Sequence, residues 1–155
     1  MLTLLDMKKR LEFHEGLRLE PYRCTQGKLT IGVGRCLDTN PLTEAERLII
    51  KNPNKITKQE AYFLLENDII NTINLLKNMV RCFSSLDDER QYALIDLGFQ
   101  LGVSGVCKFK NMLKAMEQGD FEKASKECLN SKYHKDTPAR CERIANLIKT
   151  GVWKI

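Results

Sequence analysis

The chain has 155 residues, of which 43% are hydrophobic and 29% are charged, and its formal net charge is +5. This balance excludes a disordered chain and indicates one globular domain that is large enough to bury a core. No apolar run approaches the roughly 18 residues that a membrane-spanning helix needs, so we expect no stable membrane insertion.

The N-terminal third of the chain combines one helix with a hairpin. Apolar spacing predicts a helix over 2–14 that ends near Gly16. Two stretches rich in β-forming residues, 17–24 and 28–36, flank a turn centred on Gly27 and predict a pair of strands. The polar connector that follows leaves room for one short helix.

The remainder of the chain is predicted to be helical. Thr57 and Glu60 form the capping box T-x-x-E ahead of a long amphipathic repeat, which predicts a helix from 58 to about 80. At 1.5 Å per residue this helix would be roughly 35 Å long and could join two lobes. Glycines and a proline then separate five further helices, which are expected over 85–101 (after Ser84 or Ser85), 103–108, 109–118, 121–130 and 138–150.

The expected fold class is therefore α+β, mainly α, in a single domain of residues 1–155. A small β-containing lobe would span about 15–57, and the connecting helix would span about 58–80. A helical lobe over about 81–155 would also take in the N-terminal helix. A cleft between two such lobes is a natural place for a polymer substrate.

Three side chains near the hairpin suggest acid-base chemistry. Glu15 lies at the end of the first predicted helix, where the partial negative charge of the helix terminus favours a protonated carboxylic acid. That form can protonate a leaving oxygen. Cys24 and Thr30 flank the turn and could hold a water, which gives the inverting arrangement for glycoside hydrolysis. Taken singly, such residues are more often a solvated glutamate, a packed cysteine and a β-forming threonine.

A family resemblance brings these residues together. The stretch HEGLRLEPYRCTQGKLTIGVGR at 14–35 resembles the catalytic signature of phage lysozymes of the T4 type, which are endolysins of glycoside hydrolase family 24. That signature is a Glu, eight residues, an Asp or Cys, five residues and a Thr. Two later segments, GFQLGVSGVCKF at 98–109 and TPARCERIANLIKTGVW at 137–153, are also similar to the family. The resemblance therefore covers nearly the whole chain and implies a two-lobed lysozyme-like fold.

The resemblance also implies the activity and the roles of the residues. It implies a peptidoglycan hydrolase that cuts the β-1,4 bond between N-acetylmuramic acid and N-acetylglucosamine, with inversion and without a cofactor or a metal. Glu15 would be the general acid, and Thr30 would position the attacking water. Arg140 would reach across from the C-terminal lobe to orient Glu15. The substrate-binding residues would be Phe99, Gln100, Tyr133 and Arg140.

The cysteine at position 24 stands where most T4-type members carry Asp. The reference pKa of a thiol is about 8.5 and that of an Asp carboxyl about 3.9, so Cys24 needs a lowered pKa to act near neutrality. Arg18 or Arg23 could supply it. The thiolate could take a proton from the water or attack the sugar directly, and we favour the water route because Thr30 is retained. A working thiol would make the activity sensitive to oxidation.

The other cysteines indicate no metal site. The chain has six cysteines and no C-x-x-C pair, so a structural zinc site is not expected. Most should be reduced, and several should be buried as small apolar residues. Their even number leaves a set of disulfides open, and a redox switch at Cys24 is open as well.

The resemblance further implies a phage or prophage endolysin. In MLTLLDMKKRLEF the leucines precede the lysines, the reverse of a signal peptide, so we expect the protein to fold in the host cytoplasm. We also expect it to be a monomer. A holin would then open the membrane and let it reach the wall from the periplasm. The net positive charge suits a polyanionic partner such as an acidic wall, although it could merely aid solubility.

Three other functions stay open at this point. The first is a wall-binding protein that kept the fold and lost catalysis with the Asp. The second is a lytic transglycosylase in which Glu15 works alone. The third is a nucleic-acid-binding module, which is disfavoured because no basic run with interleaved aromatics is present.

Arg35, where the family often has His, is expected to form a surface ion pair with Asp68 worth under about 1 kcal/mol.

Overall fold

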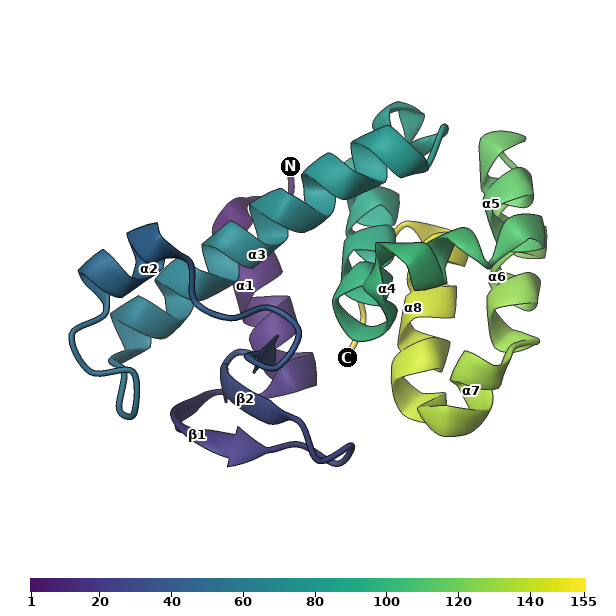
Figure 1. The fold of residues 1–155 in the computed structure, drawn as a ribbon. Helices are drawn as coiled ribbons and strands as arrows, with labels where there is room; N and C mark the ends of the chain where they lie inside the picture. Colours follow the sequence, from purple (N-terminus) through teal and green to yellow (C-terminus); the bar gives the residue numbers. More distant parts are fainter. The chain divides into compact units, whose positions relative to one another are not determined.

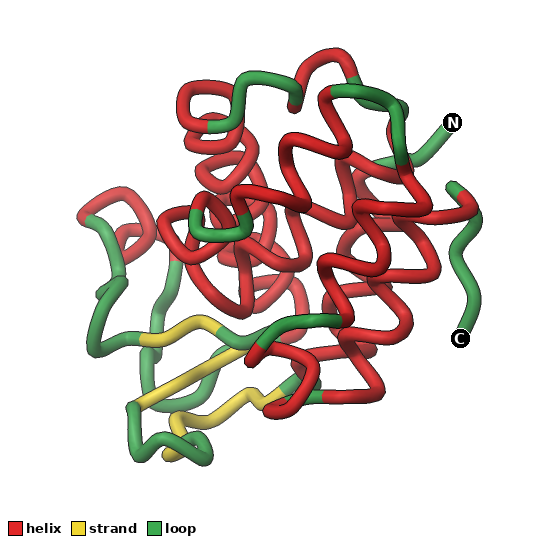
Figure 2. Tube along the Cα trace, turned by 90° about the vertical axis from the view of Figure 1, so that its right-hand side faces the viewer, coloured by secondary structure: helices red, strands yellow, loops and turns green.

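The computed structural model describes all residues from 1 to 155 and contains eight α-helices and a small three-stranded antiparallel sheet. Figures 1 and 2 show helices along most of the chain and the strands confined to one short stretch. This is the mainly α member of the α+β class that the sequence predicts. The chain divides into two compact units, Thr3–Asn71 and Thr72–Ile155, and Met1–Leu2 belongs with the second.

The unit Thr3–Asn71 contains three helices that all begin in the same way. Their bounds are α1 Leu4–Glu15, α2 Glu44–Ile49 and α3 Lys58–Met79, whose last residues belong to the other unit. At each start a threonine hydroxyl accepts from a backbone N–H three residues on, and the acidic side chain there accepts from the N–H of the threonine. These capping boxes satisfy N–H groups that a helix start leaves without partners. The pairs are Thr3 with Asp6, Thr43 with Glu46, and Thr57 with Glu60.

The sheet of this unit consists of β1 Arg18–Arg23, β2 Leu29–Gly32 and β3 Arg35–Cys36, in that order. The predicted hairpin is confirmed, and Gly27 takes the left-handed φ of 76° that its turn requires. The predicted strand over 28–36 is wrong in one respect, because β2 ends at Gly32. Gly32 and Gly34 both have left-handed φ values near 68°, and the chain turns back there into β3.

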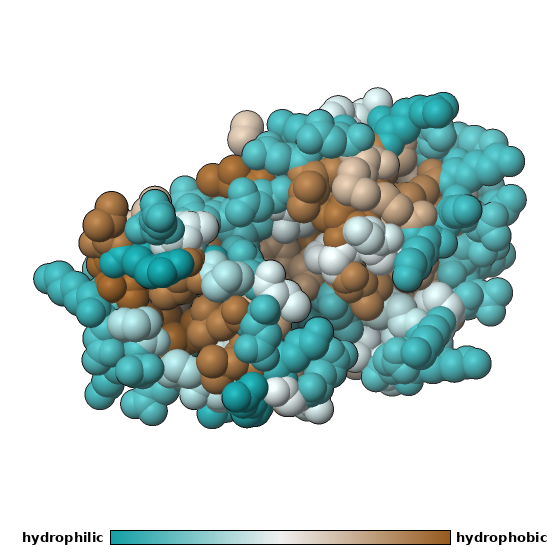
Figure 3. Space-filling view, viewed as in Figure 1, coloured by the Kyte–Doolittle hydropathy of each residue, from teal (hydrophilic) through white to brown (hydrophobic).

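A small apolar core holds the sheet, α2 and the beginning of α3 together. Five buried residues form its centre: Ile31, Ile50, Ile56, Ala61 and Leu64. Four partly buried side chains pack around it: Leu17, Leu37, Leu42 and Phe63. Since Ile31 comes from β2, this packing fixes the position of the strand that carries Thr30. Apolar side chains also gather on the surface over α2 (Figure 3), where Leu48 and Ile49 are exposed.

The second unit is helical and is built around α4. Its elements are a 3₁₀ turn Phe83–Ser85, α4 Asp88–Cys107, α5 Lys110–Glu117, α6 Phe121–Leu129, α7 Lys132–Asp136 and α8 Pro138–Thr150. Residues 92–98 of α4 are all buried, so this part of the helix is covered on every side. Helix α8 packs against both α4 and α6 (Figure 1).

Three features of this unit differ from the predictions or make them more precise. The start of α4 after Ser84 or Ser85 is wrong, because those serines lie in the 3₁₀ turn and the side chain of Asp87 caps the helix instead. Helix α7 was not predicted. The predicted break at Gly102 is confirmed as a kink inside α4, where this glycine has a φ of 75°.

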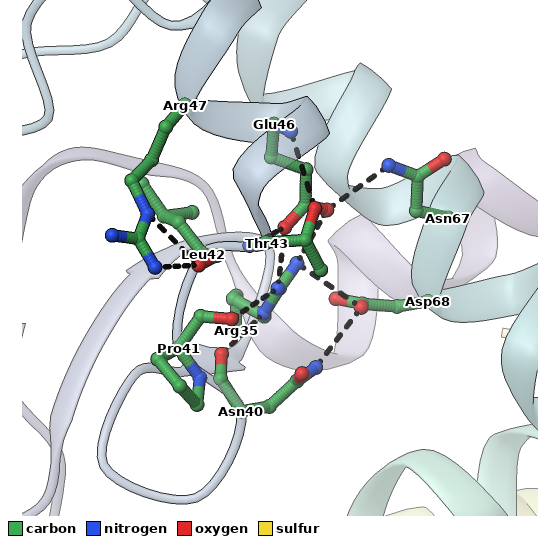
Figure 4. A network of polar contacts seen from close by, with 9 residues as sticks. All are labelled: Arg35, Asn40, Pro41, Leu42, Thr43, Glu46, Arg47, Asn67 and Asp68. Atoms are coloured by element: carbon green, nitrogen blue, oxygen red, sulfur yellow. Dashed lines mark hydrogen bonds and ion pairs between the residues drawn. The ribbon is translucent and has the colours of Figure 1, made fainter.

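Arg35 lies at the centre of a buried polar network (Figure 4). Its Nη2 is 2.8 Å from Glu46 Oε1, and its Nη1 is 3.2 Å from Asp68 Oδ1. Asn67 also donates to Glu46, and Asn40 donates to Asp68. The predicted contact with Asp68 is therefore confirmed, but the expected surface pair is wrong, because Arg35 is only 3% exposed and is shared between two carboxylates.

The two carboxylates respond to this arrangement in opposite ways. Burial by itself would raise the pKa of Glu46, but hydrogen bonds from Arg35, Asn67 and the backbone of Thr43 outweigh it and lower the pKa to about 2. Burial raises the pKa of Asp68 to about 6, and the attraction of Arg35 offsets it only in part. One guanidinium cannot neutralise two buried acids, so the less well bonded acid holds its proton more tightly.

This network predicts a distinctive pH dependence of stability. Because the pKa of Asp68 is higher in the folded protein than in the unfolded chain, its contribution is complete below about pH 4 and is lost as the pH rises through 6. Asp68→Asn cannot titrate. We therefore compare the free energy of unfolding of Asp68→Asn with that of wild type in urea titrations. The difference, variant minus wild type, should be about 2 kcal/mol more favourable to the variant at pH 7 than at pH 4.5.

Glu46→Gln is the matched comparison for that experiment. It removes the acid that Arg35 binds with two hydrogen bonds, so it should destabilise the protein by about 3 kcal/mol at pH 7. A stability difference between Asp68→Asn and wild type that stays constant with pH would show that Asp68 does not titrate in this range.

Candidate active site

Glu15 is the last residue of α1, and the chain leaves the helix at Gly16, whose φ is 78°. The turn after β2 passes directly against its side chain. A Cβ at Gly34 would lie 3.0 Å from Glu15 Oε2 and 3.1 Å from its Cδ, so only glycine fits there without a shift. The glutamate is half-buried. Gly34 therefore brings the strand turn up to the carboxyl group and leaves the acid in contact with backbone.

Cys24 and Thr30 share one face of the sheet with Tyr22. Tyr22 lies directly opposite Thr30 in the β1–β2 register, and Cys24 is two residues further along, so all three side chains point to the same side. Thr30 is only 4% exposed, and its hydroxyl donates to the carbonyl oxygen of Lys28 at 3.0 Å. The hairpin thus brings together two of the predicted site residues.

Hydrogen bonds lower the pKa of the Cys24 thiol. The largest contribution is the backbone N–H of Lys28, followed by that of Gln26. These groups belong to the turn itself. Neither Arg18 nor Arg23 is among the leading causes, so their effect on this pKa stays a prediction. The guanidinium of Arg18 lies 4.5 Å from the centre of the Tyr22 ring, and that of Arg23 donates to Gly27 O at 3.1 Å.

The pKa of the Tyr22 hydroxyl responds to both the acid and the thiol. Burial raises the pKa of its hydroxyl, the negative charge of Glu15 raises it further, and Cys24 contributes in the same direction. The tyrosine therefore lies within electrostatic range of both groups. The sequence assigned it no role. The sequence could have indicated its position, because the Gly27 turn sets the hairpin register and this register places Tyr22 opposite Thr30.

The other predicted site residues lie in the second unit. Gln100 Nε2 donates to Thr137 Oγ1 at 2.9 Å, which ties α4 to the start of α8. Phe99, beside it, is half-buried. Tyr133 is only 4% exposed, and its ring meets that of Phe109 edge-on with centroids 6.3 Å apart. Direct stacking of Tyr133 on a sugar would require it to become exposed, and its role as a substrate contact stays a prediction.

Arg140 is held by an acid that sequence reasoning missed. Its Nε lies 2.9 Å from Oδ1 of Asp96, a carboxylate with no exposed surface, and Tyr92 OH donates to Oδ2 at 2.8 Å. The signal was an aspartate within the otherwise apolar run YALIDLGF, because a buried acid needs a partner. The predicted approach of Arg140 to Glu15 would join the two units and stays a prediction.

Nowhere do three His, Cys, Asp or Glu side chains gather as they would around a metal ion. None of the helices is at once long and apolar enough to pass through a bilayer.

The mainly helical fold, with a glutamate ending α1 and a three-stranded sheet beside it, defines a lysozyme-like protein. The sequence model of the phage lysozyme family matches residues 12–147, and the chain therefore belongs to that family. At the level of the family this is a class of glycosidases that hydrolyse peptidoglycan.

Individual relatives agree with this assignment. The chain is 32% identical to the probable T4-type lysozyme 2 of Dictyostelium discoideum, over 96% of each chain. It is 34% identical to the pre-baseplate central spike protein Gp5 of Enterobacteria phage T4, over 95% of this chain but only 28% of that much longer protein. An endolysin of Acyrthosiphon pisum secondary endosymbiont phage 1 is 28% identical over 74% of the chain and 68% of its own length.

Proposed function

We propose that this protein is an endolysin-type muramidase that lyses bacteria. It would hydrolyse the β-1,4 bond between N-acetylmuramic acid and N-acetylglucosamine, with inversion and without a cofactor. The observation that carries the proposal is that the same small sheet lies against the acid and leads into the turn with the thiol. Gly34, in the turn between β2 and β3, lies against the Glu15 carboxyl group, and the backbone amides of Lys28 and Gln26, in the turn between β1 and β2, favour the Cys24 thiolate. A group that donates a proton and a group that accepts one are thereby held in one unit.

The chemistry divides between these residues as follows. Protonated Glu15 donates to the glycosidic oxygen as the bond to the anomeric carbon breaks. Thr30 gives its hydroxyl proton to Lys28 O, so its oxygen accepts one proton of the attacking water and orients the water lone pair. The Cys24 thiolate takes the other proton as the water attacks from the opposite face of the sugar. Solvent then reprotonates Glu15 and deprotonates the thiol for the next turnover.

The rest of the proposal concerns substrate contacts and compartment. Phe99, Gln100 and Arg140 would contact the saccharide, with Arg140 held rigid by its buried partner Asp96. The enzyme would act as a monomer, waiting in the host cytoplasm until a holin opens the membrane. The formal net charge of +5 would then favour its approach to an anionic wall.

The products of purified peptidoglycan test this proposal. We expect mass spectrometry to find muropeptides that carry an added water and end in reducing N-acetylmuramic acid. Fragments ending in an anhydro sugar would identify a lytic transglycosylase instead. Binding to peptidoglycan without any soluble fragment, in a protein that Cys24→Asp makes active, would identify a wall-binding protein that lost catalysis.

A further inference from the structure

Two cysteines in the second unit lie in direct contact with each other. Cys128 is in the last turn of α6 and Cys141 is in the first half of α8, and neither side chain has any exposed surface. Their sulfur atoms are 3.9 Å apart, and both thiols are free. Two other buried or half-buried thiols, Cys82 and Cys107, instead point to backbone carbonyl oxygens.

The surroundings of this pair suit a disulfide. Bonded sulfurs are about 2.05 Å apart, so closing the contact needs a movement of only about 2 Å between side chains on two packed helices. Cys141 Sγ is 3.5 Å from the carbonyl oxygen of Cys128, and the hydroxyl of Ser131 donates to the same oxygen at 2.6 Å. If the Cys141 thiol loses its proton, that carbonyl keeps a hydrogen-bond donor.

The two thiols are also chemically unequal. The hydrogen bond between them lowers the pKa of Cys141 and raises that of Cys128, and burial raises the latter further. Cys141 is therefore the thiol that forms a thiolate first and attacks an oxidant, since the thiolate is the nucleophile in disulfide exchange.

We propose that Cys128 and Cys141 form an intramolecular disulfide when the chain meets a disulfide oxidant such as glutathione disulfide, and that this bond stabilises the second unit. The Cys141 thiolate attacks the oxidant and releases one glutathione. The Cys128 thiolate then attacks the Cys141 sulfur and releases the second. Two protein thiols are oxidised by two electrons, the oxidant is reduced to two thiols, and those thiols take up the two protons.

The consequences follow from where the bond lies. Because both sulfurs are buried, exchange proceeds while the chain folds or while α6 and α8 open locally. The bond closes a short loop that contains α7, and it fixes the residue next to Arg140 in place. A cross-link over such a loop restricts the unfolded chain, so it should raise the midpoint of thermal unfolding by about 5–10 °C.

Oxidative refolding of the full chain tests the proposal. Protein unfolded in denaturant is refolded either with reduced and oxidised glutathione or with excess reductant. The refolded samples are then unfolded again, and all free thiols are alkylated in denaturant, because several cysteines are buried in the folded chain. We expect one linked peptide pair, Cys128–Cys141, in the non-reduced digest of the first sample, with the other four cysteines alkylated. Thermal melts of the two samples should differ by the shift given above.

Single variants keep the result interpretable. Cys128→Ala and Cys141→Ala should each lose both the linked peptide and the difference between oxidised and reduced melts, even if their own midpoints are lower. Cys82→Ala removes a buried thiol elsewhere in the same unit and should keep both. The proposal is overturned if Cys128 and Cys141 are alkylated after oxidative refolding, if linkage is spread over all six cysteines, or if the bond forms with no change in midpoint.

Discussion

Glu15→Gln should lower the rate of peptidoglycan hydrolysis by about 10³-fold or more while leaving the fold intact. Glutamine keeps the size of the side chain and can still form hydrogen bonds, but its amide has no acidic proton to give to the leaving oxygen. Gly34 packs closely against this side chain, so a substitution of nearly the same size and shape avoids a steric effect on the fold. The measurement is turbidity clearing of purified peptidoglycan, with circular dichroism and a thermal melt on the same sample.

Glu20→Gln provides the matched control. It makes the same chemical change at an exposed position of β1, five residues further along the chain. We expect this variant to clear peptidoglycan at the wild-type rate. Comparable clearing by Glu15→Gln would remove Glu15 from the role of general acid, and with it the mechanism proposed here.

Cys24→Ala should lower activity by about 10²–10⁴-fold, whereas Cys24→Asp should remain active with its pH profile moved to the acid side. The attacking water needs a deprotonated base, so activity rises as the pH passes through the pKa of that base. The amides of Lys28 and Gln26 lower the pKa of Cys24 from its ordinary value. The ordinary pKa of an Asp carboxyl is lower still, near 3.9. The measurement is the rate of clearing between pH 4 and 9 for the three proteins.

Alkylation tests the same thiol without changing the sequence. Cys36 lies opposite Thr30 on β3 and is also half-buried. Burial by itself would raise the pKa of its thiol, but hydrogen bonds from the side chain and backbone of Thr39 outweigh it and lower the pKa. Iodoacetamide would therefore modify Cys36 too. The experiment therefore uses Cys36→Ala protein, which should be fully active before treatment. Activity that survives complete modification of Cys24 in this background would mean that the thiol only packs there.

Much of the N-terminal unit could be predicted because its signals are local. The Gly27 turn sets the hairpin and its register, and this register places Cys24 and Thr30 on one face. The capping box at Thr57 sets the start of α3, since the partners lie three residues apart. The kink at Gly102 follows from a conformation that other residues rarely adopt.

Other features depended on packing between distant segments. Helix α7 has only five residues, which is too short to be stable alone, and it forms where Tyr133 is buried. The expected surface pair at Arg35 became a buried network because Glu46 and Asp68 approach it from two different helices. No spacing rule in a single sequence reports such burial.

By itself the sequence determined the family, the fold class and the candidate residues Glu15, Cys24 and Thr30. The family and these residues came from the resemblance of motifs at 14–35, 98–109 and 137–153, each of which is a continuous stretch that can be recognised without a structure. Only the tertiary structure decided which groups surround them and what they are bonded to. The amides that favour the Cys24 thiolate, the buried partner of Arg140 and the contact between Cys128 and Cys141 all depend on how elements pack. Burial and hydrogen bonding are properties of the folded chain, and they set the chemistry of each side chain.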